Sequence, residues 1–215
     1  MNNFDPITLA VVLALMALLP TLVIVTTSFL KIAIVMSLIR NALGVQQIPP
    51  NLALYGMALI LTVYIMAPVG NRIYENTFQQ PQAMKSIEGL VDGLRNGAEP
   101  LRDFMVRNSK PEQRDYFVNT ARKLWGAELS ANLKHTDFLV LMPAFLVSEL
   151  TAAFQIGFLL YLPFVVIDLI ISNILLSMGM MMVSPVTISL PLKLFLFVMV
   201  DGWSRLIHGL VMTYQ

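Results

Sequence analysis

The sequence predicts an all-α protein, a membrane protein by hydropathy, built from long apolar helical hairpins and a small polar helical insert. Three observations support this fold class. Hydrophobic residues make up 57% of the 215 residues, with a mean hydropathy of +0.72, whereas ordinary soluble domains are about 45–50% apolar. Two long apolar tracts flank a middle segment, 72–137, that carries ten of the 14 basic and nine of the 13 acidic residues. No stretch shows the apolar–polar alternation that is typical of a half-buried strand.

These observations divide the chain into three expected parts. They are an N-terminal apolar helical hairpin (1–70), a polar helical insert (71–137), and C-terminal apolar helices with a methionine-rich segment (138–215). The two flanking parts are so apolar that a bilayer or another subunit is their expected surrounding.

The N-terminal hairpin is predicted from two apolar tracts and the turn between them. Ile7–Ile39 exceeds the roughly 20 residues that one bilayer crossing requires. Pro20 divides this tract, which is expected to be either one long kinked helix or a span followed by a partner-facing helix, because an interior proline removes a backbone hydrogen bond and bends the axis. Val45–Pro50 predicts a turn, and Leu52–Val69 predicts the second helix, with Pro68 marking its end.

The polar insert is expected to consist of short helices, each with an apolar face. Apolar residues recur at helical spacing between Met84 and Leu94, and again after Pro100. Ser109 and Glu112 predict a capping box at the start of a further helix, and a glycine at position 126 predicts its end.

The C-terminal part is apolar from Phe138 to Val200 and is interrupted by several helix breakers. Such residues are tolerated at membrane depth where neighbouring protein satisfies the freed backbone groups. Three or four helical pieces are predicted, separated at or near Pro143, Pro163, Gly179, Pro185 and Pro191.

Four charged residues lie inside or at the end of these apolar tracts: Glu149, Asp168, Lys193 and Asp201. A charge at the centre of a membrane helix costs at least roughly 2.5–3.5 kcal/mol, so such residues usually face protein or a water-filled path. One interpretation makes the two carboxylates Glu149 and Asp168 proton carriers of a transporter. The other, which we favour, is pairing with Lys31, Lys193, Arg205 or backbone donors.

Other kinds of chemistry are poorly supported by the residues. The chain has no cysteine, and its net charge of +1 gives no reason to expect nucleic acid as a partner. Asp201, Ser204 and His208 would share one helix face, whereas a hydrolytic triad converges on a pocket; an ion pair from Asp201 to Arg205 is the simpler expectation. His135 and His208 lack a carboxylate cluster at ligand spacing, so no metal site is predicted.

A methionine cluster, Met178 and Met180–Met182 with Gly179 among them, lies ahead of the Pro185–Pro191 segment. Methionine is unbranched and flexible, so a group of such side chains can fill an irregular core or close softly around a changing shape. The residues alone leave both interpretations open.

Two stretches of the chain resemble a known family. Thr27–Val69, beginning TSFLKIAIVMSLIRNALG, and Pro143–Trp203, which contains SMGMMMVSP, closely resemble the R component of type III secretion export gates, SctR, a relative of flagellar FliP. The segment PLRDFM, Pro100–Met105, fits in position. Met1–Pro6 lacks the basic residues of a cleavable signal peptide, and because flagellar members commonly begin with one, the resemblance favours a virulence injectisome.

The resemblance implies a non-enzymatic pore subunit with neither cofactor nor metal. In this family, several copies, a pentamer, join the S and T components in a closed helical assembly, the U component wraps the gate, and unfolded proteins pass through the centre. The implied location is the bacterial inner membrane, in contact with lipid and extending toward the periplasm within the basal body. The alternatives are a flagellar export gate subunit and a stand-alone multispanning proton-coupled transporter.

The resemblance also implies roles for named residues. The channel gasket of the family falls on Met180, Met181 and Met182, with Gly179 and Met178 supporting it. The charged residues in the apolar tracts become candidate intersubunit pairs: Glu149, Asp168, Lys193, Asp201, Arg205 and Lys31.

Overall fold

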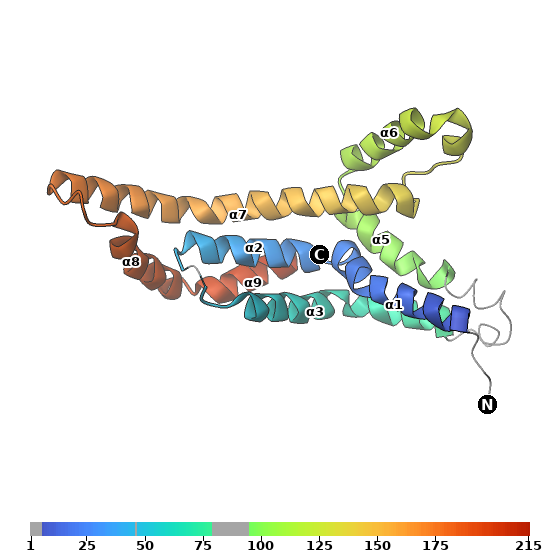
Figure 1. The fold of residues 1–215 in the computed structure, drawn as a ribbon, viewed down its shortest axis with the longest axis horizontal. Helices are drawn as coiled ribbons and strands as arrows, with labels where there is room; N and C mark the ends of the chain where they lie inside the picture. The colour runs from blue at the N-terminus through green and yellow to red at the C-terminus, as the bar shows by residue number, and fades with distance from the viewer. Residues whose placement is uncertain (1–5, 46, 79–94) are drawn as a thin grey trace. The chain divides into compact units, whose positions relative to one another are not determined.

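The regular structure in this protein is helical. The computed structural model describes residues 6–45, 47–78 and 95–215, and within these ranges every regular element is a helix, which confirms the all-α prediction. The described helices are α1 (Pro6–Thr26), α2 (Phe29–Ala42), α3 (Asn51–Phe78), α5 (Glu99–Asn108), α6 (Pro111–Ser130), α7 (Phe138–Ser177), α8 (Pro185–Met199) and α9 (Gly202–Met212) (Figure 1). The apolar stripe predicted between Met84 and Leu94 lies outside the described residues.

The chain forms two compact units. Unit 1 comprises 1–30 and 66–148, and unit 2 comprises 31–65 and 149–215, so α3 and α7 each contribute to both. Two described helices, α3 and α7, are long and apolar enough to cross a membrane; the count rises to four if the bent pairs α1–α2 and α8–α9 are each taken as one span.

Most prolines of the apolar tracts lie inside helices, Pro191 of α8 among them, whereas Pro185 begins α8. Pro68 lies within α3, so the helix end predicted there is wrong. Pro20 lies within α1, and the tract is divided further on, between Thr26 and Phe29. Pro143 and Pro163 likewise lie within α7. A proline removes a single backbone hydrogen bond, and a helix that is long and apolar continues through that loss.

The N-terminal tract instead breaks where hydroxyl side chains compete for backbone groups. The Thr26 and Thr27 hydroxyls donate to the carbonyl oxygens of Leu22 and Val23 at 2.7 and 2.6 Å. The Phe29 backbone N–H then donates to the Thr27 hydroxyl at 3.4 Å. Local side-chain bonds of this kind offer the backbone an alternative to the helix, and α1 ends here.

Unit 1 contains a small core between α5, α6 and the start of α7. Phe104 and Phe145 pack with ring centroids 5.9 Å apart. The predicted capping box is wrong, because Ser109 is the C-cap of α5 and α6 begins at Pro111, with Lys110 as N-cap and no side-chain cap bond. Gly126 interrupts α6 as a left-handed kink at φ 81°, but the helix resumes and ends at Ser130.

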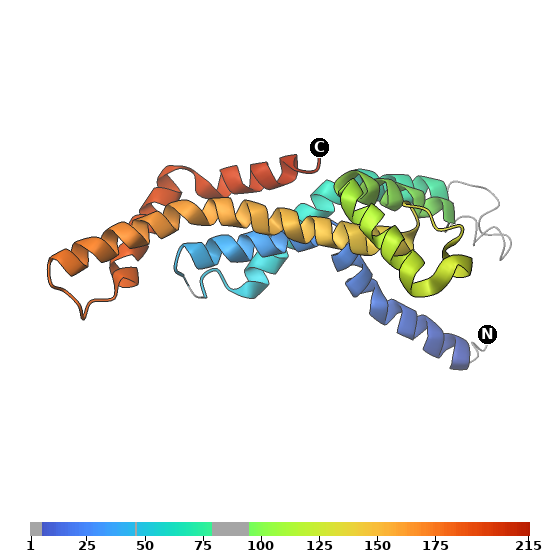
Figure 2. The same ribbon diagram turned by 90° about the horizontal axis from the view of Figure 1, so that it is seen from above.

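Unit 2 is built around the contact between α2 and α7, which lie side by side in both views (Figures 1 and 2). The inner face of α2 is almost fully buried, with at most 2% exposure at Ile32, Val35, Met36 and Ile39. After α7, the helices α8 and α9 fold back with a bend of 62° between them. Three helices thus form the C-terminal part, in agreement with the predicted three or four.

The α2–α7 contact depends on a glycine. A Cβ built at Gly157 of α7 would lie 2.2 Å from Leu38 Cδ1 and 3.2 Å from Leu38 Cβ, whereas one built at Gly209 of α9 would meet nothing within 4 Å. Gly157 therefore allows the two helix backbones to approach closely.

We predict that Gly157→Ala lowers the stability of the full chain by about 1–3 kcal/mol, because the added methyl group overpacks the α2–α7 contact. Gly209→Ala is the matched control and should be neutral or stabilising by up to about 1 kcal/mol, the usual gain for alanine in a helix. Thermal unfolding of both purified variants in detergent measures the difference. A Gly157→Ala protein as stable as the control would contradict the close approach.

Candidate functional site

The methionine loop, Met178–Met182, connects α7 to α8 and projects its side chains out of unit 2. The exposed fractions of the methionines are 67% at Met178, 41% at Met180, 81% at Met181 and 100% at Met182. Within one chain these side chains are therefore not core filler, which removes one of the two interpretations of the cluster. Four large apolar side chains are left available to contact something other than this chain.

Gly179 ends α7 in the geometry that lets the loop leave the helix. Its φ is +74°, in the left-handed region that costs an L-residue with a side chain roughly 1–2 kcal/mol. The Gly179 N–H donates to the Leu176 carbonyl at 3.0 Å and the Met180 N–H to the Leu175 carbonyl at 2.9 Å. These two bonds form a Schellman motif, which satisfies the last carbonyls of α7 and turns the chain away from the helix axis.

A largely buried polar cluster, which we call the α8 clamp, joins the two helices that flank this loop; its carboxylate, Asp168, is 34% exposed. It consists of Asp168 on α7 with Ser189 and Lys193 on α8. The Lys193 ammonium lies 2.6 Å from Asp168 Oδ2, and the Ser189 hydroxyl donates to Asp168 Oδ1 at 2.5 Å. Both residues from α8 are at most 3% exposed. The helices on either side of the methionine loop are thus fastened to each other.

The clamp also holds the end of α2. Lys193 donates to the carbonyl oxygen of Ala42, the last residue of α2, at 3.2 Å. Carbonyl groups at a helix C-terminus have no partner within the helix and carry partial negative charge, so an ammonium is well placed there. One lysine therefore joins α8 to both α2 and α7.

A second buried cluster, the charged triangle, joins α2 to α7 and to the segment after α9. Lys31 Nζ lies 3.0 Å from Glu149 Oε1 and 3.7 Å from the centroid of the Tyr214 ring. The Tyr214 hydroxyl donates to Glu149 Oε2. The Lys31 and Glu149 side chains are only 4% and 2% exposed. Each charge thus has an opposite charge or a π face as partner, as burial requires.

Tyr214 was not among the residues predicted to matter. The pKa of its phenol is raised well above the ordinary value, mainly by burial and secondly by the negative charge of Glu149. The phenol therefore stays protonated, and its hydroxyl can donate a hydrogen bond to the Glu149 carboxylate. A tyrosine that follows an apolar helix has no distinctive sequence pattern. The one available signal was that Glu149, as a carboxylate in an apolar tract, needs hydrogen-bond donors.

The structure pairs the predicted charges differently from the intersubunit expectation. Glu149 with Lys31 and Asp168 with Lys193 form ion pairs inside one chain, so these four residues do not require another subunit as partner. Asp201 does not pair with Arg205; its Oδ1 accepts a hydrogen bond from the Ser204 hydroxyl at 2.9 Å. Among the described residues, no acceptor lies within bonding distance of the Arg205 guanidinium.

The remaining candidates stay separate. Ser204 bonds to Asp201 and not to His208 in the described structure, so a triad is not assembled on α9. His135 Nδ1 lies 3.0 Å from Asp115 Oδ1 on an exposed surface. Within the described ranges, no group of three or more His, Cys, Asp or Glu residues is arranged to hold a metal ion.

Comparison with known proteins gives full-length matches. A model of the FliP family matches residues 12–210. The Yop proteins translocation protein R of Yersinia pestis is 52% identical over 98% of this chain and 97% of its own length. The harpin secretion protein HrcR of Erwinia amylovora is 47% identical, covering 99% and 98%. The virulence protein YscR of Salmonella typhimurium is 44% identical, covering 98% of each chain. These matches confirm the resemblance drawn from Thr27–Val69 and Pro143–Trp203.

The charged triangle leads to a prediction about stability. Glu149→Ala should destabilise the full chain by about 3–5 kcal/mol, because it leaves the buried Lys31 ammonium without its carboxylate. Tyr214→Phe keeps the ring beside Lys31 and loses only the hydroxyl, so it should cost about 1–3 kcal/mol. Thermal or denaturant unfolding of the purified chain in detergent measures both.

The double variant Lys31→Met with Glu149→Leu is the matched control. Replacing both charges with apolar side chains removes the stranded ion, so much of the stability lost in Glu149→Ala should return. If the double variant were as unstable as the single one, the loss would come from packing and not from the unpaired charge.

The Schellman motif leads to a second prediction. Nothing lies within 4 Å of a Cβ built at Gly179, so the cost of Gly179→Ala is conformational and should be about 1–2 kcal/mol. Gly179→Asn should cost less, because asparagine tolerates the left-handed region. Equal midpoints of thermal unfolding for the alanine variant and the native chain would argue against this turn geometry.

Proposed function

The chain belongs to the FliP family, and from this premise we propose that it is a pore-forming subunit of a type III secretion export gate. In this role it passes unfolded proteins across the bacterial inner membrane in a virulence or host-interaction injectisome. Support comes from the match over residues 12–210 and from relatives whose names refer to Yop translocation, harpin secretion and virulence. The subunit catalyses no reaction of its own and serves as a conduit.

The observation that carries this function is the exposed methionine loop held on a buried clamp. Met181 and Met182 are 81% and 100% exposed in one chain, yet the Asp168–Lys193 pair fastens the helices on both sides of them. Copies of this loop arranged around an axis would form a gasket of Met180, Met181 and Met182. Flexible thioether side chains can resist ion leakage and still yield to an extended polypeptide.

The proposed assembly contains several copies of this chain, a pentamer, together with the S, T and U components of the gate. The outer surface of α7 supports such packing, because it exposes large apolar side chains, among them Phe154, Phe158, Leu169 and Ile170. Surfaces of this kind fit either neighbouring subunits or lipid. The gate lies in the inner membrane and extends toward the periplasmic side.

The pairing of Glu149 and Asp168 favours this role over a stand-alone proton-coupled transporter. Glu149 is bound by Lys31 and Tyr214, and Asp168 by Lys193 and Ser189. Carboxylates held in this way fasten helices together, which supports a structural role for both.

The gasket is tested by replacing Met180, Met181 and Met182 together with alanine in cells that assemble the whole gate. Three truncated side chains should leave the constriction wider, so the ion conductance of the inner membrane should rise while the complex still forms on native gels. Replacement of all three with leucine, which conserves volume, should largely retain the seal.

Met199→Ala is the matched control, because Met199 is 68% exposed but lies at the end of α8, outside the loop. It should leave conductance unchanged. Unchanged conductance in an assembled alanine triple variant would overturn the gasket, and an assembled gate that lacks this chain would overturn the proposed function itself.

A further inference from the structure

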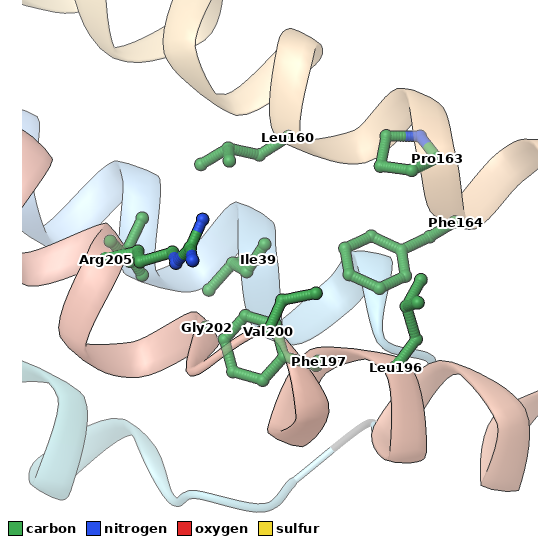
Figure 3. A pocket seen from close by; sticks show the side chains of 10 residues that line it. Ile39, Leu160, Pro163, Phe164, Leu196, Phe197, Val200, Gly202 and Arg205 are labelled. Carbon is green, nitrogen blue, oxygen red and sulfur yellow. The ribbon is translucent and has the colours of Figure 1, made fainter.

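Unit 2 contains a cavity that the proposed function does not use. It has a volume of about 340 Å³ and lies among α2, α7, α8 and α9 (Figure 3). Cavities that bind small ligands in proteins are about 300–1,000 Å³ and mostly apolar, with a few polar groups that fix orientation. This cavity has that composition, because its lining is apolar except for Arg205, including Ile39, Leu160, Phe164, Leu196, Phe197 and Leu206.

The bend between α8 and α9 creates this cavity. Asp201 at the bend adopts a left-handed conformation, with φ 52° and ψ 48°, and the two helices diverge by 62°. Gly202 follows at once, and a Cβ there would lie 2.3 Å from the Phe197 ring. The close Gly202–Phe197 contact holds the Phe197 ring at the cavity wall. The cavity is therefore shaped by the packing of α8 against the start of α9.

Arg205 gives the cavity a charged end. Its side chain extends from α9 toward Ile39, whereas Phe164 and Leu196 lie at the other end of the view (Figure 3). Arg205 is exposed, so its guanidinium lies at the open end of the cavity. No described residue accepts a hydrogen bond from it, and Asp201, one turn earlier, accepts one from Ser204. A guanidinium offers five N–H donors in a fork that matches a phosphate.

We propose that this cavity binds an anionic phospholipid, with one acyl chain against the apolar lining and the phosphate on Arg205. Such a lipid matches an apolar cavity with a cation at one end, because it is apolar along its length and anionic at its head. This chain has two described helices long and apolar enough to cross a membrane, and a bilayer around them would bring anionic lipids to the cavity. Lipid binding is independent of the proposed secretion role and is measured without it.

The chain carries its own reporter for this site. Trp203 packs edge to face on Phe197, with ring centroids 5.3 Å apart, and Phe197 lines the cavity. The only other tryptophan is Trp125. The full chain with Trp125→Phe therefore places all indole fluorescence beside the cavity, where a brominated acyl chain would quench it.

The experiment titrates this protein in detergent micelles with phosphatidylglycerol or phosphatidylcholine, each with brominated acyl chains. Saturable quenching of Trp203 is expected for both, with half-saturation at a lower concentration for phosphatidylglycerol. Arg205→Gln should weaken the phosphatidylglycerol response about tenfold or more, the loss of a charge-assisted phosphate contact. It should leave the phosphatidylcholine response nearly unchanged, because that headgroup carries no net charge.

Two variants control for folding and for general charge. Arg205→Lys keeps the charge and should retain the preference for phosphatidylglycerol, and Lys123→Gln removes an exposed cation from α6 and should change nothing. Leu160→Phe narrows the cavity and should weaken quenching by both lipids.

Three outcomes would overturn the proposal. They are the absence of saturable quenching, equal half-saturation for the two lipids in the native chain, and equal effects of Arg205→Gln and Lys123→Gln. Lipid extraction from the assembled complex adds a further check: phosphatidylglycerol should be depleted in Arg205→Gln complexes, and unchanged lipid content would mean that a neighbouring subunit fills the cavity instead.

Discussion

Unit 2 depends on one constraint, that charged groups withdrawn from water must be paired. Lys31 and Glu149 satisfy it together, and Tyr214 completes the set through its ring and its hydroxyl. Lys193 satisfies it a second time with Asp168 and the Ala42 carbonyl. Because Lys31 lies near the start of α2 and Ala42 at its end, the two clusters fasten this helix at both of its ends.

In this arrangement a rigid part of unit 2 carries the flexible side chains of the methionine loop. The α8 clamp and the Gly179 turn determine where the methionine loop leaves the unit, while the exposed thioether side chains keep their rotational freedom. Such an arrangement suits a seal around polypeptides of varying shape, because the backbone of the loop keeps its position while the methionine side chains change rotamer. The cavity beside Arg205, next to the bend at Asp201, lies in the same rigid part.

Much of this organisation could be predicted from the sequence, since hydropathy and charge act locally. The apolar helices, the charges that require partners and the methionine cluster all follow from composition and spacing. Two helix ends did not follow. Pro68 costs only one hydrogen bond and α3 continues through it, while α1 ends where the hydroxyls of Thr26 and Thr27 provide a competing partner for the backbone. The role of Tyr214 depends on a contact between segments far apart in the chain, and no local pattern records it.

The charged triangle also has a consequence for biosynthesis. Glu149 follows Lys31 by 118 positions and Tyr214 follows Glu149 by 65. At ribosomal rates of roughly 5–20 residues per second, Lys31 is synthesised about 6–24 s before Glu149. During that interval the nascent α2 carries a cation without its partner, which raises the cost of transferring this apolar helix into a bilayer until Glu149 is present.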